Sequence, residues 1–180
     1  MTQTAERPAA EALSRGSSTA YMGNVNFHRC LCDLLDGAER EIADYVIPEQ
    51  RPDEHDRFIL QGYANANRRG VQCRTLISAP HLNLVQSTWD PQFDMRTFLS
   101  KVPHIRLVER VSGPFTVTDR RKVLINLADP ADPAEYTTSV VVEDAAFAEA
   151  LLGRFDALWE EAGVRQEELI SAWEAASTRG

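Results

Sequence analysis

The residues best suited to metal chemistry stand close together near the N-terminus: His28, Cys30 and Cys32. On a helix, His28 and Cys32 are four residues apart and share a face, so two ligands for zinc or a similar ion could converge there. The residues that could complete such a site are Cys73, His55, His81 and His104. Free cysteine is also commonly a small buried hydrophobic residue. We therefore expect neither a metal nor a cofactor.

Motifs for nucleotide binding and for serine nucleophiles are missing from the sequence. Neither GxGxxG nor GxxxxGK[ST] occurs, and no serine lies in a GxSxG turn. No neighbouring pattern predicts a lowered pKa for a cysteine thiol. The acidic residues between Glu49 and Asp56 lack the spacing of a calcium loop. Any chemistry must therefore come from a less regular arrangement.

Size and charge restrict the class of protein. A chain of 180 residues is long enough for one domain with a core and too short for two. The net charge of −8 argues against direct binding of DNA or RNA, because Lys and Arg supply most nucleic-acid affinity. The longest apolar runs have the length of a strand, and the first residues lack the apolar core of a secretory signal. We expect a cytoplasmic protein that contacts neither nucleic acid nor membrane directly.

Hydrophobic periodicity predicts an alternation of helices and strands. Helices are expected at about 25–39, 54–69, 92–101 and 145–162. Strands are expected at 42–47, 71–78, 104–109, 115–118, 123–127 and 136–143. The core-facing side of the second helix is predicted to carry Phe58, Ile59, Tyr63 and Ala66. The loop 79–91 has no regular pattern.

Three segments follow from this pattern. Residues 1–19 are expected to be a mobile leader, 20–163 one domain, and 164–180 a C-terminal helix. Helices that alternate with strands and then give way to a run of strands predict an α/β domain, with a mixed central sheet and helices packed on both faces.

The order of these elements resembles one half of the phospholipase D superfamily, over about Val25 to Ala162. The likeness is carried by a helix ending in ANRRGVQCRTLI, the strand HIRLVE, the hairpin FTVTDRRKVLIN, the strand VVVEDAAF and the helix GRFDALWEEA. The resemblance implies a phospholipase-D-like half-domain.

The catalytic motif of that superfamily is incomplete here. The motif is His, one residue, Lys, four residues and Asp, followed by Gly-Ser-x-Asn. With Asp119 in the Asp position, the His position falls on Ser112 and the Lys position on Pro114. The later positions fall on Asn126, Leu127 and Asp129. Phosphodiester cleavage in that family needs an imidazole nucleophile and lysines that hold the phosphate charge, so we expect catalysis to be lost.

Degenerate domains of this kind are similar to the effector-sensing domains of TrmB-type and some LuxR-type bacterial transcription regulators, in which the former catalytic cleft binds a small molecule. Those regulators also carry a helix-turn-helix, and the sequence shows none. Either the protein is a stand-alone sensor, or the DNA-binding part lies on another chain or was removed. The resemblance implies a homodimer, since two such halves face each other across a cleft.

The leading hypothesis is a non-catalytic domain that binds a small molecule and acts in transcriptional or metabolic regulation. The site is expected at the carboxyl ends of the central strands. Its expected residues are Tyr45, Ser78, His81, Ser112, Thr116, Asn126 and Asp129. Asp119 is expected to be structural, accepting hydrogen bonds from turn amides at its own hairpin.

Two alternatives stay open. One is a pathway enzyme that reuses the cleft, with His81 or His104 as base and Asp129 or Glu109 as partner. The other is an interaction module that docks through its last helix, with Leu169, Ile170 and Trp173 as anchors.

Overall fold

A computed structural model describes residues 17–22, 24–46, 56–78, 104–109, 111, 113–128, 136–165 and 168. The helices are α2 (Asn24–Gly37), α3 (Asp56–Arg68) and α6 (Ala145–Glu161). The strands are β1 (Ser17–Met22), β2 (Glu41–Val46), β3 (Gln72–Ser78), β4 (Ile105–Val108), β5 (Phe115–Thr118), β6 (Lys122–Ala128), β7 (Tyr136–Glu143) and β8 (Val164–Arg165). None of the helices in these ranges is long and apolar enough to cross a membrane.

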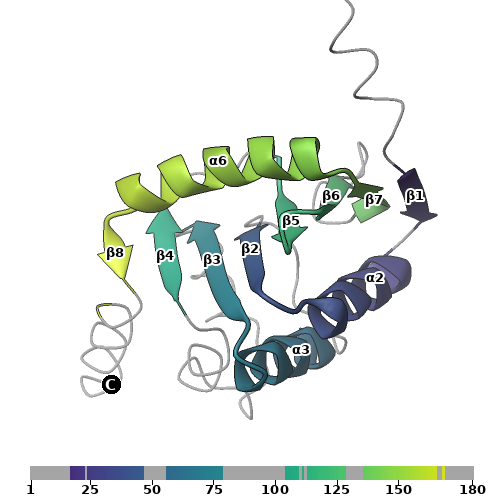
Figure 1. Cartoon of the computed structure of the whole chain (residues 1–180), viewed down its shortest axis with the longest axis horizontal. Helices are drawn as coiled ribbons and strands as arrows, with labels where there is room; N and C mark the ends of the chain where they lie inside the picture. The colour runs from purple at the N-terminus through teal and green to yellow at the C-terminus, as the bar shows by residue number, and fades with distance from the viewer. Residues whose placement is uncertain are drawn as a thin grey trace, which may run out of the picture.

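The described strands form one mixed sheet in the order β1-β7-β6-β5-β2-β3-β4-β8. Strands β2, β3 and β4 are parallel neighbours, and the other pairings are antiparallel. Figure 1 shows α6 crossing one face of this sheet, while α2 and α3 lie on the other side. The predicted fold class, a mixed sheet with helices on both faces, is confirmed.

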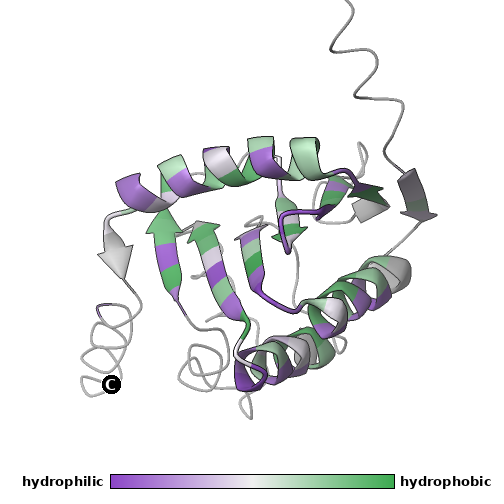
Figure 2. Ribbon diagram, viewed as in Figure 1, coloured by the Kyte–Doolittle hydropathy of each residue, from purple (hydrophilic) through white to green (hydrophobic). Residues whose placement is uncertain are grey.

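Each face of the sheet has its own core because successive strand residues point to opposite faces. Ile42, Cys73 and Leu124 pack against α2 and α3. Ala43, Leu76 and Val117 pack against α6. Hydrophilic and hydrophobic residues alternate along the helices (Figure 2), as expected for helices that are buried on one side only.

Local signals set two of the element boundaries and one close contact between helices. The side chain of Asp144 caps α6 by accepting a hydrogen bond from the Phe147 N–H at 2.9 Å. Gly70 follows α3 with φ 85°, a conformation that glycine adopts without strain. Gly62 lets α2 and α3 approach closely, since a Cβ there would lie 2.9 Å from the Leu35 Cδ1.

Three sequence expectations need correction. Phe58 is 51% exposed instead of facing the core, and Leu60 is buried in its place. The strand β1 begins at Ser17, inside the segment predicted to be a mobile leader, and pairs with β7. Val164 and Arg165 form β8 against β4, where a helix was predicted to start. Open backbone groups at the two edges of a sheet favour such added strands. The predicted helix at 92–101 lies outside the described residues.

Candidate functional site

The expected site lies at the end of the sheet where the parallel strands finish, which we call the carboxyl end. Strand β5 runs antiparallel to β2, so Phe115 at its start is the partner of Tyr45 near the end of β2. Ser78, the last residue of β3, is the partner of Val108, the last residue of β4. The register therefore brings Tyr45 and Ser78 to the same end of the sheet.

Tyr45 points to the face under α6. Its side chain is buried, and its ring centroid lies 5.5 Å from that of Phe115. Val108 and Val111 belong to the same apolar cluster. Of the remaining expected site residues, the side chain of Ser78 and the whole of His81, Ser112 and Asp129 lie outside the described residues.

Thr116 and Asn126 point to the opposite face of the sheet. The Oδ1 of Asn126 accepts a hydrogen bond of 3.0 Å from the hydroxyl of Ser139, its partner on β7. The hydroxyl of Thr116 donates to the Oδ1 of Asp44 at 2.7 Å. The sheet thus divides the expected residues, with Tyr45 on one face and Thr116 and Asn126 on the other.

Asp44 was missed as a candidate and is the most unusual polar group at this end. It is 7% exposed, and its second carboxyl oxygen accepts a hydrogen bond from the Tyr63 hydroxyl. Burial raises the pKa of Asp44, and the bonds from Tyr63 and Thr116 offset this only in part. No ion pair reaches Asp44 in the part of the chain that the structure describes.

The Tyr63 hydroxyl beside Asp44 stays protonated. Burial, followed by the Asp44 charge, raises the pKa of Tyr63 well above its ordinary value, so this hydroxyl remains a donor. Thr75, the partner of Asp44 on β3, is 3% exposed, and among the described residues its hydroxyl has no hydrogen-bond partner. Asp44, Tyr63, Thr75 and Thr116 can together hold a proton and form hydrogen bonds, but none of these four is an activated nucleophile. An acidic residue inside the apolar run IADYVI was the sequence signal for this group.

Two of the three metal candidates near the N-terminus are buried, and Cys32 is partly exposed. His28 and Cys30 are buried on α2. Burial, followed by the Asp33 carboxylate, raises the pKa of Cys30 to about 11, and burial raises that of Cys73 to about 11, so both remain thiols. Within the described ranges, no group of three or more His, Cys, Asp or Glu residues could hold a metal ion.

Two positions of the phospholipase D motif, Pro114 and Asp119, lie on either side of β5. Pro114 is buried immediately before the strand and follows Gly113, whose φ is 70°. Asp119 lies beyond the other end of β5, in the turn to β6, at what we call the amino end of the sheet. The strand therefore separates the Lys position from the Asp position of the family motif.

Asp119 joins two turns. Its carboxylate accepts hydrogen bonds from the backbone N–H groups of Glu39 at 2.9 Å, Arg40 at 2.8 Å and Glu41 at 3.1 Å. Partial burial acts to raise the pKa of Asp119, but these three donors outweigh it and lower the pKa. The expected structural role is present, although the amides belong to the α2–β2 turn and not to the hairpin of Asp119.

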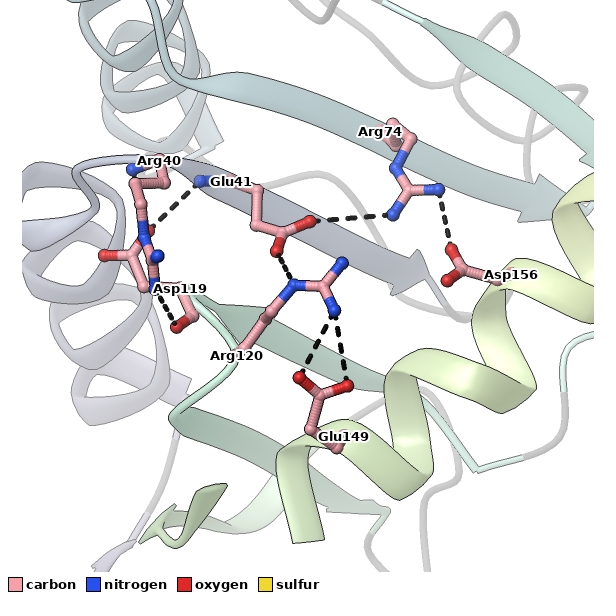
Figure 3. Close-up of polar contacts among 7 residues, drawn as sticks. All are labelled: Arg40, Glu41, Arg74, Asp119, Arg120, Glu149 and Asp156. Atoms are coloured by element: carbon pink, nitrogen blue, oxygen red, sulfur yellow. Dashed lines mark hydrogen bonds and ion pairs between the residues drawn. The ribbon is translucent and has the colours of Figure 1, made fainter. Parts of the chain in front are cut away.

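Arg120, the residue after Asp119, takes part in a network of charged side chains (Figure 3). The Arg120 guanidinium binds Glu41, and its Nη1 lies 3.2 Å from Glu149 on α6. Glu41 also lies 3.8 Å from Arg74, which pairs with Asp156 at 2.7 Å. The amino end is thereby connected to β3 and α6.

The structure separates one of the proposed catalytic pairs. His104 precedes β4 and Glu109 follows it, so the two residues lie at opposite ends of that strand. A strand of this length spans more than about 13 Å, which excludes a hydrogen bond between their side chains. The pair of His104 with Glu109 is therefore no catalytic dyad within this chain.

Comparison with solved structures shows a phospholipase-D-like fold. Nuc, a phospholipase D family member from Salmonella typhimurium, matches with TM-score 0.59 and 13% identity over 83% of this chain and 97% of its own. NucT from Helicobacter pylori matches with TM-score 0.56 and 12% identity, covering 82% and 98%.

The archaeal chromatin protein TrmBL2, whose structure shows a novel mode of DNA binding, matches with TM-score 0.58 and 19% identity over 81% of this chain. This chain spans about half of TrmBL2, 52% of its length. Among curated protein sequences, no match is found. A family described as "Domain of unknown function (DUF7436)" matches residues 19–164.

Proposed function

The chain belongs to this family of unknown function, and we propose that it is a non-catalytic sensor domain that binds a small molecule at the carboxyl end of its sheet. The phospholipase-D-like fold supports this place for the site. In open α/β sheets, ligands bind at the carboxyl ends of the parallel strands.

The observation that carries the proposal is the buried Pro114. This residue takes the position at which the phospholipase D superfamily motif has a phosphate-binding lysine. Proline carries no charge and has no side-chain donor, so it cannot stabilise the negative charge of a phosphodiester during cleavage. The described residues next to it in sequence that carry side chains, Val111 and Phe115, are buried and apolar, so they do not replace that charge.

The described residues favour a guest that is partly apolar and partly polar. Aromatic and aliphatic side chains line the α6 face at this end, and a guest that extends past the strand ends to the other face would meet Asn126, whose Oδ1 is already bonded to Ser139. Small-molecule sites commonly combine an apolar lining with a few polar groups that fix orientation. Arg106, in register with Leu76 and Tyr45, is a cation on the same face, but its guanidinium donates to the Trp159 carbonyl and lies over the Trp159 ring, so a fully ionised phosphate would have to compete for it.

We extend the proposal to a homodimer with a regulatory role. Two half-size domains related by a two-fold axis are the simplest way to complete a shared cleft. The likeness to TrmBL2 supports a regulatory role, because that protein is a chromatin protein that binds DNA. It combines a similar domain with further sequence, since this chain covers 52% of its length. In this scheme the present chain senses the effector, and contact with DNA is left to another segment or chain.

Native mass spectrometry of the purified protein tests the bound small molecule and the homodimer at once. We expect the mass of two chains together with a small molecule that is released on denaturation. Asn126→Leu should lower the retained fraction, while the surface change Asp36→Asn should leave it unchanged. A monomer that retains nothing, and that gains no mass when incubated with a cell metabolite extract, would refute the proposal.

A further inference from the structure

A hollow lies at the amino end of the sheet, away from the site proposed above. It has a volume of about 530 Å³ and is enclosed by the end of α2, the α2–β2 turn and the β5–β6 turn. An adjoining hollow of about 200 Å³ shares Asp33, Leu34 and Lys122 with it and reaches Tyr21 on β1. Typical small-molecule sites occupy about 300–1,000 Å³, so the space suits a metabolite.

One wall of this hollow contains a hydroxyl side chain. Thr118 is 3% exposed and lines the hollow. Its backbone carbonyl accepts a hydrogen bond from the Arg121 N–H at 3.1 Å. A threonine hydroxyl on the wall of a cavity can donate a hydrogen bond to a polar group of a guest.

The charges that line the hollow fall into two groups. The carboxylate of Asp119 is occupied by three backbone N–H groups, and Arg121 pairs with Glu143 at 2.6 Å. Asp33, Glu39 and Lys122, by contrast, take part in no ion pair among the described residues, and Arg40 donates to the backbone carbonyl of Asp119. Of these charged residues, Asp33 and Lys122 line both hollows, so the two hollows share one anion and one cation.

The negative side of the hollow comes from Asp33 and not from the helix end. The last carbonyls of α2 are offset by Arg69, which donates to the carbonyls of Leu35 at 2.7 Å and Ala38 at 3.2 Å. The exposed carboxylate of Asp33, one turn before that end, favours a cationic group beside it. Lys122 at the start of β6 favours an anionic group.

We propose that this hollow binds a small zwitterion of the amino-acid type. The ammonium group pairs with Asp33 near the end of α2, and the carboxylate pairs with Lys122 and accepts a hydrogen bond from Thr118. Leu34 offers an apolar contact to a side chain. Such a ligand would connect α2 to the β5–β6 hairpin, independently of any guest at the carboxyl end.

Calorimetric titration with three related probes tests the charge requirement. L-leucine carries both charges, L-leucinamide lacks the carboxylate, and N-acetyl-L-leucine lacks the ammonium group. We expect saturable binding of L-leucine and at least about tenfold weaker binding of the other two, since charge-assisted hydrogen bonds are the strong ones. Equal binding of all three, or no binding of L-leucine at millimolar concentration, would overturn the proposal.

Variants locate the binding within the chain. Lys122→Met and Asp33→Asn should each weaken L-leucine binding at least about tenfold, because each removes one charged partner. Asp36→Asn, an exposed change on the same helix, is the matched control and should bind like the unchanged protein. Circular dichroism confirms that each variant is folded. Unchanged affinity in both folded variants would contradict the assignment.

Discussion

Asp44 and Asp119 stand near opposite ends of the same pair of strands and are held by different groups. Asp44 is buried near the carboxyl end and accepts hydrogen bonds from the hydroxyls of Thr116 and Tyr63. Asp119 is partly exposed at the amino end and accepts from three backbone N–H groups. The pKa of Asp44 is raised, whereas that of Asp119 is lowered.

The difference shows which end of the sheet depends on the identity of particular side chains. Backbone donors are present whatever the side chains are, so Asp119 depends only on the path of two turns. The hydroxyls around Asp44 come from particular residues on β5 and α3, and losing one leaves one oxygen of the buried carboxyl group without a donor. The amino end is thus fixed by the fold, and the carboxyl end by the identities of its side chains.

Thr116→Val should give the largest loss of stability. The change keeps the shape of the side chain but removes the donor to the Asp44 Oδ1, and a buried acceptor without a partner costs about 3 kcal/mol. Urea denaturation measures the free energy of unfolding. Thr19→Val, at an exposed position of β1, is the control and should change it little. Equal effects of the two changes would show that Asp44 does not depend on this bond.

Asp119→Asn should destabilise the protein by about 2 kcal/mol, because hydrogen bonds to a charged acceptor become bonds to a neutral amide. The same denaturation experiment measures it. Asp36→Asn makes the same chemical change on the exposed side of α2 and should have almost no effect. A loss smaller than that of the control would contradict the role of Asp119 in joining the two turns.

The two aspartates should impose pH dependences of opposite sign. The raised pKa of Asp44 means that the folded state keeps a proton that the unfolded state releases, so stability falls as pH rises from the ordinary aspartate value to the raised one. The lowered pKa of Asp119 contributes stability above the ordinary value, and this is lost as pH falls to the lowered one.

Denaturation between pH 2 and pH 8 would separate these contributions. Asp44→Asn should remove the fall above the ordinary aspartate pKa, and Asp119→Asn should remove part of the loss below it. If both variants change the same side of the profile, the two carboxyl groups do not differ as described.

Arg120→Gln should have the smallest effect. Its guanidinium bonds to Glu41 and Glu149 are on the surface, where solvent and salt weaken ion pairs. The denaturation midpoint should move only at low ionic strength, and Arg154→Gln serves as the exposed control on α6. A large shift at physiological salt would show that the network in Figure 3 holds the amino end more strongly than surface pairs usually do.

Regular periodicity made most of the fold predictable. The strand Tyr136–Glu143 was predicted with its observed limits, because Thr138, Val140 and Val142 alternate with their neighbours. The strands β1 and β8 were not predicted, since SSTAYM and VR have no such pattern. Their formation depends on the open edges of β7 and β4, which are distant in sequence.

The sequence predicted which end of the sheet three of the expected residues occupy, but not which face they lie on. The order of elements placed Tyr45, Thr116 and Asn126 near the carboxyl end, but periodicity alone did not show that the sheet separates Tyr45 from the other two. Tyr63 was predicted as a core residue on α3, and its hydroxyl was not connected to Asp44 because helix and strand positions give no register between them. Phe58 was assigned to the core because periodicity did not show which side of α3 the sheet covers.

The most direct test of the central claim is a phosphodiesterase assay with bis(p-nitrophenyl) phosphate. Because Pro114 occupies the position of the phosphate-binding lysine, we expect hydrolysis by the protein to equal that of buffer and of the Ser112→Ala variant. Turnover above buffer that Ser112→Ala abolishes would show that the carboxyl end is a catalytic site, and would contradict this account.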